Sequence, residues 1–144
     1  MNGLFVDTAG WMACADAADP FHEKARAARD AWIERRGSLV TTDYVIDESL
    51  TLIRVRLGLQ AAEAWWKQVE GSSRVRFEYM DLDRMDKARG IFFRFKDKDF
   101  SFTDCASFVV MQELKLKHVL TTDHHFHQMG FQMVPEAQKR TPSG

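Results

Sequence analysis

Short apolar runs alternate with longer helix-like segments along almost the whole of this 144-residue chain. The runs have the length and composition of buried strands. They lie at residues 4–6, 39–42, 75–80, 119–121 and 131–134. Strands that alternate with helices are joined by right-handed crossovers, which favour a mainly parallel sheet covered on both faces. The sequence therefore predicts an α/β fold with three layers, α/β/α, around a central sheet of about five strands.

Length and composition indicate one folded domain. With 45% hydrophobic residues, the chain has enough apolar side chains for a core. A domain of this size buries about two-thirds of the surface that its unfolded chain exposes. We expect a single domain over residues 1–138. The polar residues 139–144, which include Pro142, are expected to form a flexible C-terminal tail.

Charge, cysteine content and hydropathy restrict the binding partners and the cellular environment of the protein. Twenty basic and twenty-one acidic residues give a net charge of −1, so any binding to nucleic acid requires a local basic patch. Cys14 and Cys105 show neither disulfide nor zinc-site spacing, which favours a reducing environment. No apolar run approaches the ~20 residues that span a membrane, and no signal peptide is evident. We expect a cytoplasmic protein that does not bind membranes.

Two acidic residues directly follow predicted strands. Asp7 follows the run at 4–6, and Asp123 follows the run at 119–121. In parallel sheets, ligands bind outside the carboxyl ends of the strands, so both side chains are expected at one edge of the sheet. Thr8 and Thr122 are their neighbours in the chain, and these hydroxyl groups are candidates for orienting a carboxylate or a metal-bound water.

Asp104 is the third candidate acid. Residues 101–104 read Ser-Phe-Thr-Asp, which is a helix-capping pattern ahead of the apolar run at 106–116. Taken alone, Asp104 is sufficiently explained as a helix cap. A helix that begins there would also place its carboxylate near the strand ends, so the two roles are compatible.

Glu48 is chosen over its neighbour Asp47 by a helical-wheel argument. On a helix over residues 44–57, Glu48 shares a stripe with Val45, Leu52 and Val55, whereas Asp47 lies on a polar stripe. The opposite stripe is also apolar, so we expect this helix to be buried on two sides. A carboxylate in an apolar stripe requires a cation, so the sequence predicts that Glu48 contributes to the acidic site.

Several carboxylates gathered at one place predict a metal site. Two unit charges about 4 Å apart repel by about 4 kcal/mol at an effective dielectric constant near 20, so the cluster requires a counter-ion or protonation. Oxygen ligands favour Mg²⁺ or Mn²⁺ over zinc. Such a site suits phosphodiester hydrolysis, because a cation neutralises a phosphate oxygen and activates water without a protein nucleophile.

Four short motifs, in this order and spacing, resemble a PIN domain over nearly the whole chain. They are Phe5-Val6-Asp7-Thr8, then Thr42 with Glu48, then Phe102-Thr103-Asp104-Cys105-Ala106, and finally Leu120-Thr121-Thr122-Asp123 followed by Phe126. The arrangement is most similar to the VapC-type toxins of prokaryotic toxin–antitoxin pairs, which are small endoribonucleases.

The resemblance implies both a site and partners. The metal site would comprise Asp7, Glu48, Asp104 and Asp123, with Thr103 or Thr122 in supporting roles. It would cleave RNA with Mg²⁺ or Mn²⁺. The resemblance further implies a homodimer, and inhibition by a cognate antitoxin protein whose tail occupies the active-site groove.

Two other features are open to more than one interpretation. The histidines in Asp123-His124-His125-Phe126-His127 suggest a transition-metal site, but a loop beside the acidic site explains them as well. A basic stretch interleaved with Phe residues would suit single-stranded RNA, or simply be the solvated face of a helix at 84–98. The stretch begins at Lys87, and its RNA-contact candidates are Arg89, Arg94, Lys96 and Lys98.

Two other functions compete with the nuclease. A haloacid-dehalogenase-like phosphotransferase also has an Asp after its first strand, but it requires a second Asp two positions later, where this chain has Ala9. The other alternative is a non-catalytic PIN-like module that binds RNA or protein.

Trp65 and Trp66 are interpreted as core or dimer contacts.

Overall fold

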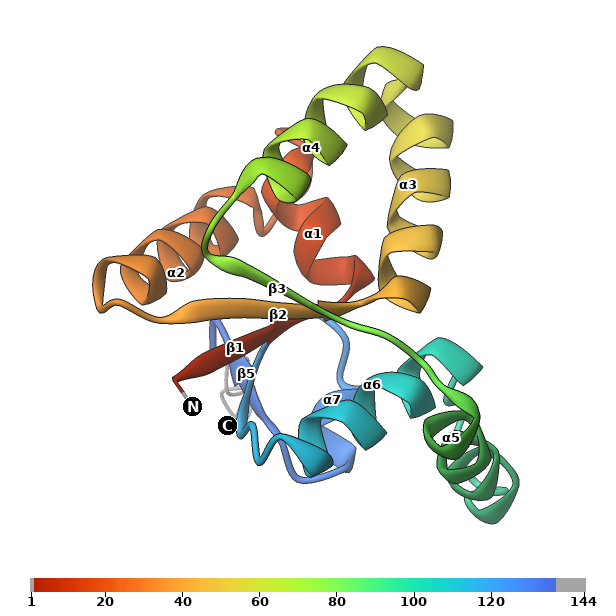
Figure 1. Cartoon of the computed structure of the whole chain (residues 1–144). Helices are drawn as coiled ribbons and strands as arrows, with labels where there is room; N and C mark the ends of the chain where they lie inside the picture. The colour runs from red at the N-terminus through yellow and green to blue at the C-terminus, as the bar shows by residue number, and fades with distance from the viewer. Residues whose placement is uncertain (1, 137–144) are drawn as a thin grey trace, which may run out of the picture.

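The computed structural model describes residues 2–136, which form a three-layer α/β/α fold (Figure 1). Its central sheet has five strands, all parallel, in the order β3-β2-β1-β4-β5. The fold class predicted from the sequence is confirmed, and each strand end lies within one or two residues of its expected position. The strands are β1 (Gly3–Val6), β2 (Ser38–Thr42), β3 (Val75–Glu78), β4 (His118–Leu120) and β5 (Gln132–Val134).

Helices cover both faces of the sheet (Figure 1). On one face lie α1 (Thr8–Ala15), α2 (His22–Glu34), α3 (Asp43–Leu57) and α4 (Leu59–Gly71). On the other lie α5 (Leu82–Arg94), α6 (Phe102–Glu113) and the short α7 (His125–Gln128). Gly58 separates α3 from α4 with a φ of 98°, a left-handed conformation that glycine adopts without steric cost. As a result, α3 and α4 form a hairpin that projects beyond the sheet.

One helix boundary differs from its prediction, and one acid caps a turn. Asp19 accepts a hydrogen bond from the Phe21 amide (2.8 Å), so it caps the turn that precedes α2. Helix α5 was expected at 84–98, but Asp81 caps its start, and the helix runs through Gly90 and ends at Arg94. Lys96 and Lys98 therefore lie beyond the helix. The predicted tail at 139–144 lies outside the described residues.

The core consists of apolar side chains on both sides of β1, whose residues from Leu4 to Val6 are fully buried. Trp65 is buried and packs edge-on against Trp11, with ring centroids 5.6 Å apart, in agreement with the expected core role. Cys14 and Cys105 are buried free thiols. None of the helices within residues 2–136 is both long and apolar enough to cross a membrane.

The strand order determines which edge of the sheet is suited to bind a ligand. Because β1 pairs with β2 on one side and β4 on the other, the chain reverses its winding direction at β1. Open parallel sheets bind ligands at such a switch point, beyond the carboxyl ends of the strands. Val6 is in register with Leu120, so the residues that follow β1 and β4 emerge side by side.

Gly10 is required where α1 approaches β4. A Cβ atom at this position would overlap the carbonyl oxygen of Leu120 and crowd Val6. We predict that Gly10→Ala lowers the free energy of unfolding by about 1–3 kcal/mol, as overpacked core positions do. Gly90→Ala is the matched control, because a Cβ there meets no atom within 4 Å and a helical alanine stabilises by about 0.5–1 kcal/mol. Urea denaturation measures both; equal effects would contradict the close approach.

Candidate active site

Asp7 lies at the junction between β1 and α1, where it caps the helix. One carboxylate oxygen, Oδ1, accepts a hydrogen bond from the Gly10 amide at 2.8 Å. The other, Oδ2, accepts one from the Thr121 hydroxyl at 2.7 Å. The residue is only 5% exposed. Thr121, which follows β4, therefore orients this carboxylate, a role for which Thr8 and Thr122 were the candidates.

Burial dominates the protonation of Asp7. Loss of solvent raises its pKa from 3.8 to about 7, against the two hydrogen bonds from Thr121 and Gly10, which lower it. The negative charges of Asp123 and Asp104 raise the pKa further. The hydrogen-bond partners of Asp7 within residues 2–136 are both neutral. A cation near Asp7 would favour the ionised carboxylate.

Asp104 combines two roles. Its backbone amide donates to the Ser101 hydroxyl, and its Oδ2 accepts from the Ser101 amide, both at 3.0 Å, so the predicted capping box is present. The same oxygen lies 3.0 Å from Nδ1 of His125. Burial raises the pKa of Asp104, while the hydrogen bonds from Ser101 and His125 lower it. The cap therefore holds a carboxylate directed at the carboxyl edge of the sheet.

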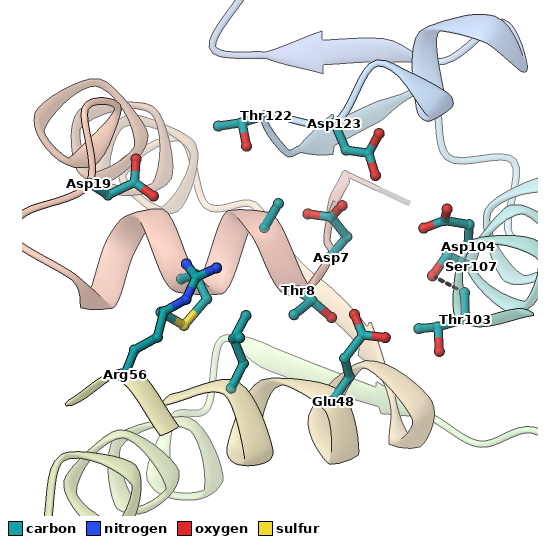
Figure 2. A pocket seen from close by; sticks show the side chains of 13 residues that line it. Asp7, Thr8, Asp19, Glu48, Arg56, Thr103, Asp104, Ser107, Thr122 and Asp123 are labelled. Carbon is teal, nitrogen blue, oxygen red and sulfur yellow. Dashed lines mark hydrogen bonds between the residues drawn. The ribbon is translucent and has the colours of Figure 1, made fainter. Parts of the chain in front are cut away.

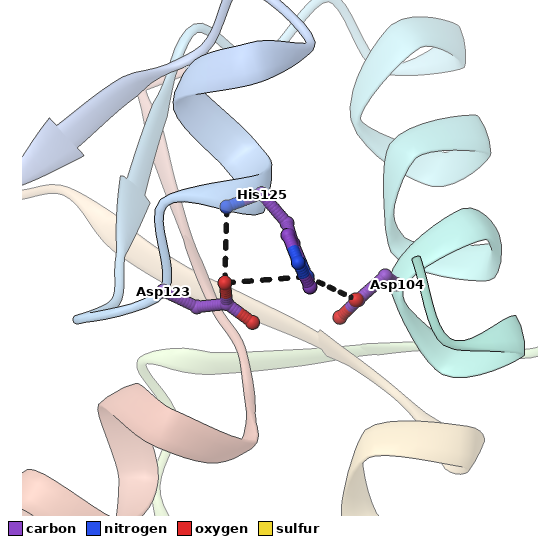
Figure 3. A group of neighbouring side chains, drawn as sticks. All are labelled: Asp104, Asp123 and His125. Atoms are coloured by element: carbon purple, nitrogen blue, oxygen red, sulfur yellow. Dashed lines mark hydrogen bonds and ion pairs between the residues drawn. The ribbon is translucent and has the colours of Figure 1, made fainter. Parts of the chain in front are cut away.

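Asp123 lies opposite Asp104, on the segment after β4 (Figure 3). Its amide donates to the Thr121 hydroxyl at 2.9 Å, and its Oδ1 accepts from the His125 amide at 3.0 Å. Nδ1 of His125 lies 3.3 Å from the same Oδ1. The histidines were expected in a loop, but His125 begins α7, which fixes its ring between the two carboxylates.

Glu48 reaches the site from α3, but the reasoning that selected it was wrong. Glu48 is exposed, and Val55 on its stripe is 77% exposed. The cause is tertiary, because α3 leaves the sheet with α4 and buries only one side of its surface. Burial therefore does not force Glu48 to find a cation. Its carboxylate nevertheless points into the same cavity as Asp7 (Figure 2).

A cavity of about 320 Å³ brings the predicted acids together (Figure 2). Its lining includes every predicted acid and the three supporting threonines, namely Asp7, Glu48, Asp104, Asp123, Thr8, Thr103 and Thr122. Thr8 is 8% exposed, and its buried hydroxyl oxygen has no hydrogen-bond partner within the described part of the chain. An unpartnered buried hydroxyl is costly, so this oxygen is available to a ligand in the cavity.

Sequence reasoning missed several residues of the site. Asp19 and Arg56 line one end of the cavity, away from Asp123 (Figure 2). A signal for Arg56 was present, because Glu48, Leu52 and Arg56 are spaced four residues apart and so share a helix face. No comparable signal marks Asp19, which reaches the cavity only because α1 and α2 pack together.

The basic RNA-contact candidates lie elsewhere. Arg89 pairs with Asp86, Arg94 stacks over the ring of Phe95, and Lys98 lies 3.7 Å from Asp97. Lys96 is exposed after the end of α5. Lys87 binds Glu113 at 3.1 Å. These residues do not line the acidic cavity, so a contact with RNA would involve a part of the substrate outside it.

The donor set fits a hard divalent cation. The cavity combines carboxylate oxygens with hydroxyl groups, and the buried hydroxyl of Thr8 has no hydrogen-bond partner among the residues that the structure describes. Oxygen donors suit Mg²⁺ and Mn²⁺. Buried Asp7, with its raised pKa and two nearby acids, is the residue that a bound cation would stabilise most.

Comparison with known proteins identifies the family. The model of the PIN domain matches residues 4–132. A Mycobacterium tuberculosis protein named 23S rRNA-specific endonuclease VapC20 is 30% identical over 128 residues, which cover 89% of this chain and 95% of that protein. The chain therefore belongs to the PIN-domain family, and it is a ribonuclease of the VapC type, as its motifs predicted.

A second relative and two solved structures are also similar to this chain. Ribonuclease VapC26 of M. tuberculosis is 25% identical over 126 residues, covering 85% of this chain and 89% of that protein. The crystal structure of M. tuberculosis VapC20, described as a Sarcin-Ricin loop cleaving toxin, superposes with a TM-score of 0.80 over 89% of this chain and 95% of that chain. FitAcB from Neisseria gonorrhoeae, at 15% identity, has a TM-score of 0.66 over 90% of this chain and 95% of that chain, which supports the fold alone.

The raised pKa of Asp7 predicts a pH-dependent stability in EDTA. The folded state binds the Asp7 proton more tightly than the unfolded state, so this contribution is fully present below pH 3.8 and is lost as pH rises through about 7. The complete loss is on the order of 4 kcal/mol at about 1.4 kcal/mol per pKa unit.

Asp7→Asn, which stays neutral, should therefore unfold at a higher temperature than wild type at pH 8 in EDTA, and the difference should shrink at pH 5. Differential scanning calorimetry at both pH values measures this. Asp47→Asn is the control, because Asp47 is an exposed acid outside the cavity. A wild type more stable than Asp7→Asn at pH 8 would contradict the proposed cost of burial.

Proposed function

We propose that this protein is a Mg²⁺- or Mn²⁺-dependent endoribonuclease whose catalytic residues are Asp7, Glu48, Asp104 and Asp123. The observation that carries the proposal is the convergence of these carboxylates on one cavity, with a buried carboxylate and an unpartnered hydroxyl at its base. The similarity to VapC ribonucleases establishes the class of enzyme. The proposal adds the identity of the metal and the role of each residue.

Each acid has a distinct task. Asp7 and Asp104 are held by helix caps, so their oxygens are preorganised to bind the cation. Asp123 is aligned by Thr121 and completes the ligands on the β4 side. Glu48 is exposed, which suits a ligand that acts directly or through water. When bound, the cation neutralises a phosphate oxygen and lowers the pKa of an attacking water.

Other cavity residues position the substrate. Arg56 provides a positive charge at the end of the cavity opposite Asp123, where it would contact a flanking phosphate (Figure 2). The Thr8 hydroxyl offers a donor to a cation-bound water or a phosphate oxygen. We propose Arg89, Arg94, Lys96 and Lys98 as contacts for RNA that extends beyond the cavity.

The phosphotransferase alternative lacks its second acid. Ala9 lines the cavity with a methyl group at the position where that chemistry requires a carboxyl group. A non-catalytic module remains the outcome if no RNA is cleaved and no metal is bound.

Three partners belong to the proposal. RNA is the substrate, a second copy of the chain forms a homodimer, and a cognate antitoxin inserts a basic side chain into the acidic cavity. Val55, Leu57 and Leu59 are exposed around the α3–α4 turn and offer apolar surface to a second copy, which sedimentation velocity would detect. An RNA substrate is consistent with a cytoplasmic location.

The nuclease proposal is tested with RNA and metal. A hairpin carrying the ribosomal sarcin–ricin loop is the first substrate, because VapC20 is described as a toxin that cleaves that loop. Wild type should cleave with Mg²⁺ or Mn²⁺ and not with EDTA. Asp7→Asn and Asp104→Asn should each lower the cleavage rate about 10²-fold or more, because each removes a charge from the metal site.

Glu48→Gln and Asp47→Asn form a matched pair on adjacent residues of α3. Glu48 lines the cavity and Asp47 does not, so only the first substitution should slow cleavage. Gel analysis of end-labelled RNA measures the rates, and thermal unfolding checks the fold. Wild-type rates for Asp7→Asn or Asp104→Asn would remove those residues from the mechanism.

A basic peptide tests the antitoxin site. A short Arg-containing peptide should slow cleavage by wild type through competition for the acidic cavity, and this inhibition should weaken as salt increases. An uncharged peptide of the same length is the control. Inhibition that does not compete with RNA would place the antitoxin elsewhere.

A further inference from the structure

His125 lies between two of the proposed metal ligands and points a ring nitrogen at both. Nδ1 is 3.0 Å from Oδ2 of Asp104 and 3.3 Å from Oδ1 of Asp123 (Figure 3). The three residues each offer one ligand atom, all within 4.8 Å of one another. Adjacent ligands around an octahedral cation with bonds of about 2.1 Å are separated by about 3 Å, which these distances match.

The imidazole ring is held in this position by independent contacts. Its plane packs edge-on against Phe100, with centroids 5.4 Å apart, and Phe100 in turn packs on Phe108 in the core. The backbone amide of His125 donates to Asp123, so the start of α7 cannot rotate away without breaking that bond. The nitrogen therefore faces the carboxylates because the surrounding structure fixes it there.

A second observation points to a ligand beside the same two carboxylates. The buried hydroxyl of Thr8 has no hydrogen-bond partner within residues 2–136, and it lines the cavity that Asp104 and Asp123 also line. His125 does not line that cavity, but its Nδ1 lies within 3.0 and 3.3 Å of the two carboxylates that do. Nitrogen and oxygen donors thus meet at the edge of the cavity.

We propose that His125 is a direct metal ligand, which together with Asp104 and Asp123 forms a mixed nitrogen and oxygen site that selects Mn²⁺ over Mg²⁺. Imidazole nitrogen suits transition metals, whereas Mg²⁺ prefers oxygen ligands and keeps its waters. The inference rests on the proposed metal-dependent function and extends it, because four carboxylates alone do not discriminate between the two ions.

The competing interpretation is a positioning role, in which the Nδ1 proton only orients the carboxylates through hydrogen bonds. His125→Asn separates the two, because an amide can donate to a carboxylate but offers no imidazole nitrogen to a metal. His127→Asn is the matched control, since His127 is exposed on the same short helix.

The test uses Mn²⁺ or Mg²⁺ alone with the full chain, without RNA. Electron spin echo spectroscopy of bound Mn²⁺ should show coupling to a ligated ¹⁴N in wild type and in His127→Asn, and none in His125→Asn. Titration should give His125→Asn about a tenfold or greater loss of Mn²⁺ affinity, with Mg²⁺ affinity nearly unchanged.

Wild-type Mn²⁺ without ¹⁴N coupling, or no Mn²⁺ binding at all, overturns the proposal. So does an equal loss of affinity for both ions in His125→Asn, which would assign a positioning role. Because the wild-type spectrum needs no variant, a folding failure of His125→Asn does not obscure the answer. Failure to cleave RNA would instead affect only the nuclease proposal, since this test contains no RNA.

Discussion

Asp7 joins three elements of the fold. The residue directly follows β1, and its carboxylate caps α1 and accepts a hydrogen bond from Thr121, which follows β4. These bonds hold the ends of two adjacent parallel strands together at the switch point of the sheet. Gly10 makes the arrangement possible, because only a residue without Cβ lets α1 approach Leu120 so closely. Asp123 is held at the same junction, because its amide donates to the Thr121 hydroxyl.

The site draws its precision from structural caps. Asp7 and Asp104 satisfy backbone amides at the starts of α1 and α6 and at the same time direct carboxylate oxygens toward the cavity. Helix N-termini favour negative charge, so the two helix starts partly offset the repulsion among the acids. The remaining cost appears in the raised pKa of Asp7, where burial outweighs both hydrogen bonds. A divalent cation would convert that cost into binding affinity.

Local patterns in the sequence determined much of this protein. Apolar runs set the five strands, and their alternation with helices dictated a parallel sheet with two covered faces. Because parallel strands end at one edge, the positions of Asp7 and Asp123 after two such runs sufficed to predict that they would meet. The capping pattern of Ser101 and Asp104 was equally local and is present in the structure.

Tertiary packing alone decided which side chains meet across distant segments. Glu48 faces an open cavity rather than a buried stripe because the α3–α4 hairpin leaves the sheet, which no helical wheel reveals. Thr121, rather than its neighbour Thr122, binds Asp7 because the end of β4 turns that hydroxyl toward β1. His125 faces two carboxylates only because Phe100 and α7 fix its ring. Sequence periodicity determines the faces of single elements, whereas contacts between elements depend on how those faces pack.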